Sequence, residues 1–195
     1  MDRDEVKELH FISTIDNLDS ILMRGIVCHN RAKRLPHRSI ASVSVQDRRR
    51  GKSVPGGLSL HNYANLYFNA RNAMMYYLQD EPDLVVIRVS PDVLDIPDTV
   101  ITDGNAAAGP TLFLPSPSGL RHLDSTRIFA WSWNDPDPWV KIEKKRVRQA
   151  EVLVPYLVSS EYIEGCYVDT RDKRRACLEF EDLPAVDVRR EIFFK

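Results

Sequence analysis

The sequence predicts a single α+β domain, and three features of its 195 residues support this class. Short apolar runs and short amphipathic segments follow one another irregularly, without the strand–helix–strand alternation of a parallel α/β protein. Apolar residues make up 43% and charged residues 28% of the chain, the balance of a globular domain with a core. This length fits one domain, residues 1–195, with room for a large inserted loop.

The N-terminal region predicts a strand followed by a short helix. The strand is the apolar run in "ELHFIS", which ends in polar residues. Residues 14–25 predict the helix, because Leu18, Ile21 and Leu22 form one apolar stripe. Thr14 or Asp16 can cap its start, and a glycine ends it.

A basic segment follows at residues 31–52. It holds eight arginine and lysine residues against Asp47, a formal charge of +7, so the rest of the chain carries −8. Such a stripe favours an anionic ligand or a polyanion groove, although a solvated basic loop has the same pattern. The segment predicts one short helix near residues 40–49. After it, "NLYFNARNAMMYYL" predicts a strand at residues 66–68, a polar turn and a helix.

The second half of the chain predicts further strands and one long loop. "DLVVIRVS" predicts a buried strand, and "TVITDG" and "AEVLVP" predict two more. Residues 161–168 predict another strand, and the tail from Leu183 predicts an edge strand. Residues 104–141 hold several prolines, three tryptophans and no clean period, so they predict a loop, and loops of that length are usually functional or disordered.

Several familiar kinds of site lack their marker in this sequence. There is no P-loop, no GxGxxG and no GxSxG motif, and no histidine pair has metal-ligand spacing, so no metal site is expected. Three cysteines, an odd number, indicate reduced thiols. The charged N-terminus does not resemble a signal peptide, and no run approaches the roughly 20 apolar residues of a membrane span. We therefore expect a cytoplasmic protein that does not enter a membrane.

One carboxylate, Glu151, stands where the strand in "VRQAEVLVP" begins, after a run of basic side chains. It could simply be solvated at the mouth of a strand, or it could be a fixed negative charge for a reaction that develops positive charge. His10, at the end of another strand, could equally be a satisfied core histidine. The three tryptophans of the long loop could stack on bases or pack on the core.

These pieces together resemble a known family. "LHFISTIDNLDSILMRGI", "SVQDRRRGKSVPGG", "LYFNARNAMMYYL", "ITDGNAA" and "RQAEVLVP" occur in the order and rough spacing of the DarT-type DNA ADP-ribosyltransferase toxins, over about residues 9–168. The resemblance implies an ADP-ribosyltransferase-like fold, with a central split β-sheet core and flanking short helices. It also implies transfer of ADP-ribose from NAD, without a metal, to a base of single-stranded DNA, most commonly thymine. A macrodomain antitoxin of the DarG type would reverse the mark.

The resemblance also assigns roles to residues. Glu151 and Arg49 would be catalytic, residues 34–51 would form the NAD-binding element, and residues 105–151 would form the loop that presents the DNA base. The implied NAD-contacting residues are His10, Phe11, Ile12, Ser13, Ser20, Cys28, Arg49, Tyr67, Asn69 and Met74. The implied acceptor-binding residues are Arg48, Arg50, Arg71, Asn105, Lys144 and Arg148. Where the family reads H-F-T-H this chain reads H-F-I-S-T, so Ile12, Ser13 or Thr14 could replace the family threonine.

The implied chemistry suits these residue types. Departure of nicotinamide from NAD leaves an oxocarbenium-like sugar, which a carboxylate such as Glu151 would stabilise. Arginine is a poor general base because its pKa is above about 12, so Arg49 is expected to act electrostatically, on the pyrophosphate or on the base anion. Guanine or RNA as acceptor, water as acceptor, and a non-catalytic nucleic-acid-binding relative stay open as alternatives. A monomer is expected.

Overall fold

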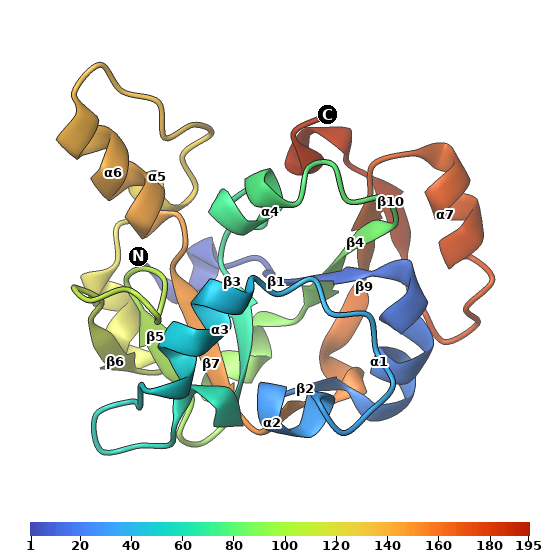
Figure 1. Ribbon diagram of the computed structural model, residues 1–195, viewed down its shortest axis with the longest axis horizontal. Helices are drawn as coiled ribbons and strands as arrows, with labels where there is room; N and C mark the ends of the chain where they lie inside the picture. The colour runs from blue at the N-terminus through green and yellow to red at the C-terminus, as the bar shows by residue number, and fades with distance from the viewer.

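The computed structural model describes residues 1–195, and an eight-stranded sheet runs through the molecule (Figure 1). The strand order is β10-β9-β4-β1-β3-β7-β5-β6, and every pair is antiparallel except β9 with β10. The strands are β1 (Leu9–Thr14), β3 (Tyr63–Tyr67), β4 (Leu84–Val89), β5 (Val100–Thr102), β6 (Phe113–Pro115), β7 (Glu151–Pro155), β9 (Ile163–Val168) and β10 (Val186–Val188). A second sheet pairs β2 (Ile26–Val27) with β8 (Leu157–Val158).

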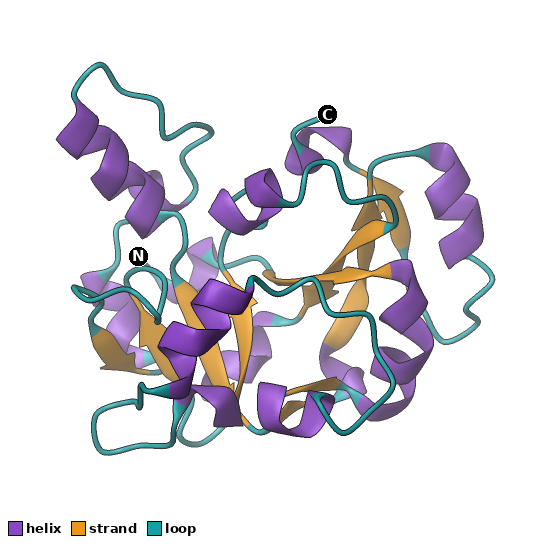
Figure 2. Ribbon diagram, in the orientation of Figure 1, coloured by secondary structure: helices purple, strands orange, loops and turns teal.

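Short helices surround the sheet (Figure 2), so the predicted α+β class is confirmed. The α-helices are α1 (Leu18–Arg24), α2 (His29–Ala32), α3 (Val43–Arg50), α4 (Ala73–Tyr77), α5 (Ser125–Ile128), α6 (Pro138–Val147) and α7 (Arg171–Cys177). The 3-10 helices are η1 (Arg3–Glu5), η2 (Ile15–Asn17), η3 (Leu60–Asn62), η4 (Pro91–Asp95), η5 (Ser118–His122), η6 (Ser160–Tyr162) and η7 (Arg190–Phe193). None of these helices combines the length and the hydropathy that crossing a bilayer requires.

The large sheet is split between β1 and β3. These neighbours share one register pair, His10 opposite Tyr67, whereas β1 and β4 share six, from Leu9–Val89 to Thr14–Leu84. The sheet therefore separates into two half-sheets, β10-β9-β4-β1 and β3-β7-β5-β6. This is the central split that the family resemblance implies.

Strand β4 is buried on both of its faces and anchors β1. Its residues Val85, Ile87 and Val89 belong to the largest apolar cluster, while Leu84 and Val86 belong to a second cluster on the other face. A strand covered on both sides needs apolar residues at nearly every position, which is why the run "DLVVIRVS" predicted it well. Strands β1, β7 and β9 and the edge strand β10 also lie where the sequence predicted them.

The predicted caps of the first helix are wrong. The segment begins with the 3-10 turn η2, and α1 starts only at Leu18; neither Thr14 nor Asn17, which precede these two elements, makes a side-chain capping bond. The carboxylate of Asp16 turns outward instead and pairs with Arg38 at 3.2 Å. The predicted end is confirmed, since Gly25 follows α1 with φ of 77°.

The prediction of one long loop at residues 104–141 is also wrong. The segment contains β6, η5, α5 and the beginning of α6, which projects from the body of the molecule (Figure 1). The side chain of Asp137 caps α6 by accepting from the N–H groups of Trp139 and Val140, and Pro138 occupies the first turn. Because most of α6 is exposed, it lacks the apolar stripe by which helices are recognised in a sequence.

Candidate active site

A cleft of about 510 Å³ lies between the two half-sheets. Phe11 and Ser13 of β1 line it from one side, and Asn65 and Tyr67 of β3 line it from the other. Ten of its 32 lining residues fall within residues 34–51, so the predicted NAD-binding segment forms one wall. The volume lies within the range of roughly 300–1,000 Å³ that small-molecule sites occupy.

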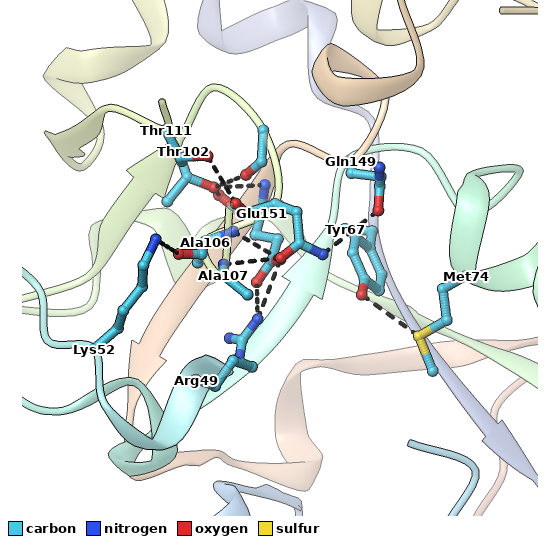
Figure 3. A network of polar contacts seen from close by, with 12 residues as sticks. Arg49, Lys52, Tyr67, Met74, Thr102, Ala106, Ala107, Thr111, Gln149 and Glu151 are labelled. Carbon is cyan, nitrogen blue, oxygen red and sulfur yellow. Dashed lines mark hydrogen bonds and ion pairs between the residues drawn. The ribbon is translucent and has the colours of Figure 1, made fainter. Parts of the chain in front are cut away.

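An ion pair between Arg49 and Glu151 lies at this cleft. The Arg49 Nη1 donates to Oε1 of Glu151 at 3.2 Å and to Oε2 at 3.0 Å. The carboxylate is fully buried, and the arginine side chain is 5% exposed. Figure 3 shows Arg49 reaching from α3 toward Glu151 at the start of β7, whose register partner on β3 is Tyr67.

The turn after β5 wraps around this carboxylate. The Ala106 N–H donates to Oε1 of Glu151 at 3.2 Å, and the Glu151 N–H donates to the hydroxyl of Thr102 at 3.0 Å (Figure 3). Thr102 and Thr111 brace the turn by donating to the carbonyls of Gly104 and Asn105. The small residues of "ITDGNAA" thus allow the backbone to approach a buried acid closely and to hold it in one orientation.

The guanidinium of Arg49 stands between the acid and the cleft. Arg49 lines the cleft and Glu151 does not, although the two side chains touch. The Nη2 atom of Arg49 is buried and has no hydrogen-bond partner. A buried charged donor without a partner is costly, so this atom is suited to an oxygen of a bound ligand. Tyr67, beside the pair, stays a neutral phenol because burial and the nearby Glu151 carboxylate raise its pKa.

Most of the residues expected to contact NAD meet in the cleft. Those lining it are Phe11, Ile12, Ser13, Ser20, Arg49, Tyr67 and Met74. The other three do not line it: Cys28 is buried, and Asn69 donates to the carbonyl of Ile128 at 2.8 Å. His10 lines a neighbouring pocket, where its Nε2 lies 3.0 Å from Oε1 of Glu8.

The residues expected to bind the acceptor are dispersed. Asn105 lines the cleft, whereas Arg71 and Arg148 line the neighbouring pocket. Arg48 and Arg50 are exposed, and Lys144 pairs with Asp135 at 2.7 Å. No group of three or more histidine, cysteine, aspartate or glutamate side chains is placed to hold a metal ion.

The sequence missed two features of the cleft. Gln149 lines it and accepts from the amide of Asn105 at 3.4 Å, and only its closeness to Glu151 in the chain hinted at this. His29 also lines it, with its ring 4.2 Å from that of His61. Burial first, and then the positive charge of His61, lower the pKa of His29; burial and the charge of Arg49 lower that of His61.

Comparison with known proteins gives consistent results. Residues 10–194 match the family described as "ssDNA thymidine ADP-ribosyltransferase, DarT". A DNA ADP-ribosyl transferase–DNA ADP-ribosyl glycohydrolase fusion protein of Thermosipho africanus is 31% identical over 174 residues, which are 85% of this chain and 43% of the fusion protein. A DNA ADP-ribosyl transferase of Thermus sp. is 32% identical over 165 residues, which are 77% of this chain and 75% of that protein.

The solved structures agree with these matches. Thermus sp. 2.9 DarT in complex with ADP-ribosylated ssDNA superposes with a TM-score of 0.82 at 27% identity, over 97% of both chains. The same protein in complex with NAD+ superposes with a TM-score of 0.78 at 25% identity, over 97% of this chain and 98% of that one. The fold and the site together define an ADP-ribosyltransferase-type protein. The chain belongs to the DarT family.

Proposed function

We propose that this protein transfers ADP-ribose from NAD to thymidine in single-stranded DNA and releases nicotinamide. The observation that carries the proposal is the buried Arg49–Glu151 pair at the cleft of about 510 Å³ between the half-sheets. The family match and the Thermus complexes with NAD+ and with ADP-ribosylated ssDNA support the two substrates. We further propose that it acts in the cytoplasm as a monomeric toxin, opposed by a macrodomain antitoxin of the DarG type.

In this reaction the bond between C1 of the ribose and the nicotinamide nitrogen breaks. The cationic nicotinamide takes the electron pair and leaves neutral, so positive charge develops on C1 and the ring oxygen. The carboxylate of Glu151 stabilises that charge, and hydrogen bonds to the ribose 2-hydroxyl tighten in the transition state of related sugar chemistry. A nitrogen of the acceptor base forms the new bond to C1, and its proton passes to water.

Arg49 has two functions in this proposal. In the protein without substrate its Nη1 neutralises the buried carboxylate, which keeps Glu151 in place inside the sheet. Its free Nη2 then donates to a phosphate oxygen of NAD or to the base that loses a proton. Since Arg49 covers Glu151, NAD must displace part of this pair before the carboxylate can reach the ribose.

The test is incubation of the protein with NAD and defined single-stranded oligomers, followed by mass spectrometry. The expected result is one added ADP-ribose on oligomers that contain thymidine, together with an equal amount of free nicotinamide. The Glu151→Gln variant is the control and should give neither product. If only guanine or only RNA is modified, that acceptor replaces thymidine in the proposal. If nicotinamide is released without any modified polymer, the acceptor is water. Binding of oligomers without any release would identify a non-catalytic relative.

A further inference from the structure

A second pocket, of about 410 Å³, lies beside the cleft and shares no lining residue with it. We call it the arginine pocket. It is formed by the segment before β1, the loop after β3, the loop after α5, the turn before β7 and the C-terminal turn η7. The residues that carry the argument are Glu8, Arg71, Trp131, Arg148, Arg189 and Glu191.

Arg148 is buried in this pocket without a counter-ion. It is 1% exposed, and the only hydrogen bond of its side chain is from Nη2 to the carbonyl of Arg71. Its Nε and Nη1 have no partner, and no carboxylate contributes to its electrostatic surroundings. The guanidinium stacks on Trp133, 4.7 Å from the ring centroid. Burial first, and then the charge of Arg71, lower its pKa to about 10.

Arg71 is a second guanidinium of this pocket, and it is half-buried. Its Nη1 donates to the carbonyl of Glu191 at 2.6 Å, while its Nε is buried and has no partner. It stacks on Trp131 at 4.5 Å and on Phe194 at 3.7 Å. Burial lowers the pKa of Arg71, and the nearby charge of Glu191 opposes this shift. The two arginines thus place like charges against aromatic rings, and three of their nitrogen donors have no hydrogen-bond partner.

The carboxylates of the pocket are already engaged elsewhere. Glu8 accepts from Arg88, from Tyr167 and from the His10 ring, and Glu191 pairs with Arg189 at 2.6 Å. Glu5 accepts from the hydroxyl of Ser125 and from a backbone N–H. Arg148 therefore has no carboxylate partner within the chain, and Arg71 has only the nearby charge of Glu191, which already pairs with Arg189. An anion with several oxygens supplies the missing partner, and guanidinium groups match phosphate oxygens well.

The position of the pocket indicates which anion it takes. Arg148 precedes Glu151 by three residues, so their Cα atoms lie at most about 11 Å apart. This distance spans about three nucleotides at the roughly 3.4 Å rise of a stacked strand. Trp131, 63% exposed, stands at the pocket and offers a ring on which a base can stack.

We propose that the arginine pocket holds one backbone phosphate of the single-stranded acceptor, within about three nucleotides of the modified base. This inference rests on the proposed function. The test is a scan of single-thymidine oligomers, each with one phosphate replaced by a neutral methylphosphonate. We expect kcat/KM for transfer to fall about tenfold or more at one position and to change little elsewhere, because a charge-assisted contact is lost there.

The Arg71→Gln variant identifies the contact. It should raise KM for DNA rather than KM for NAD, and it should no longer respond to the methylphosphonate at the sensitive position. Arg127→Gln, which changes an exposed arginine paired with Glu143 outside the pocket, should keep the full response of the native protein. Thermal unfolding of both variants confirms that they are folded.

The outcomes separate this inference from the function on which it rests. If the native protein modifies no single-stranded oligomer, both are overturned. If it modifies them and the scan is flat, or if Arg71→Gln keeps the native response, only the arginine pocket is overturned. The scan could also be flat while inorganic phosphate raises the melting temperature of the native protein but not that of Arg71→Gln. That result would overturn the DNA contact and assign the pocket to a free anion.

Discussion

One nitrogen of Arg49, Nη1, bridges both carboxylate oxygens of Glu151, which is fully buried, while the arginine side chain is 5% exposed at the cleft. The two residues are 102 positions apart in the sequence. A buried pair of this kind contributes little net stability compared with apolar residues, but removal of one partner is strongly destabilising. The pair therefore links the chemistry of the site to the integrity of the fold.

Replacement of Glu151 should separate these two effects. Glu151→Ala leaves the Arg49 guanidinium buried and unpaired, so we expect a loss of about 3–5 kcal/mol in the free energy of unfolding. Glu151→Gln keeps the volume and can still accept hydrogen bonds, so its loss should be smaller. Both should reduce nicotinamide release in the presence of DNA at least about a hundredfold. Denaturant unfolding and a nicotinamide assay measure the two effects, and an active Glu151→Gln variant would refute the role of the carboxylate.

Neighbouring arginines of α3 provide a matched pair. Arg49→Lys keeps the charge but loses the second guanidinium nitrogen, so transfer and stability should both fall. Arg50→Lys should change neither much, because that side chain is 73% exposed and pairs only with Asp47. Equal losses in the two variants, measured by the same assays, would mean that Arg49 is not the arginine that acts.

Two glycines should respond in opposite ways to alanine. At Gly25 φ is 77°, and a Cβ would lie 2.2 Å from the carbonyl oxygen of Val158, so Gly25→Ala should cost at least about 1–3 kcal/mol. At Gly51 a Cβ meets nothing within 4 Å and φ is −90°, so Gly51→Ala should be neutral or slightly stabilising. Melting temperatures decide this, and a tolerated Gly25→Ala would argue against the close contact of α1 with β8.

The neighbouring imidazoles of His29 and His61 predict a free energy of unfolding that declines as pH falls below about 6.5. Their pKa values are lowered from 6.5 in the fold, so the unfolded chain binds protons that the folded chain does not. Their contribution is complete above about pH 6.5 and is lost as pH falls through the lowered values. The double variant His29→Gln with His61→Gln should lose less melting temperature between about pH 7 and pH 5 than the native protein. Parallel profiles would contradict this coupling.

Much of the sheet could be predicted from the sequence, because β1, β4 and β7 are apolar runs whose burial shows in their composition. Helix α6 was missed because its exposed faces leave no apolar period, although Asp137 followed by Pro138 was a usable start signal. The family resemblance named Arg49 and Glu151, but their direct contact joins residues 102 positions apart and depends on the tertiary structure. The resemblance assigned Arg148 to acceptor binding, but only the tertiary structure shows that its side chain is buried.

The order of strands in the sheet also affects how the protein emerges from the ribosome. Strands β3 and β5 are made early, yet β7 lies between them and comes later in the chain. Until β7 has been synthesised, its half-sheet lacks a central strand, and Arg49 has no carboxylate with which to form an ion pair. A partly translated or prematurely terminated chain therefore lacks the Arg49–Glu151 pair on which the proposed transfer depends.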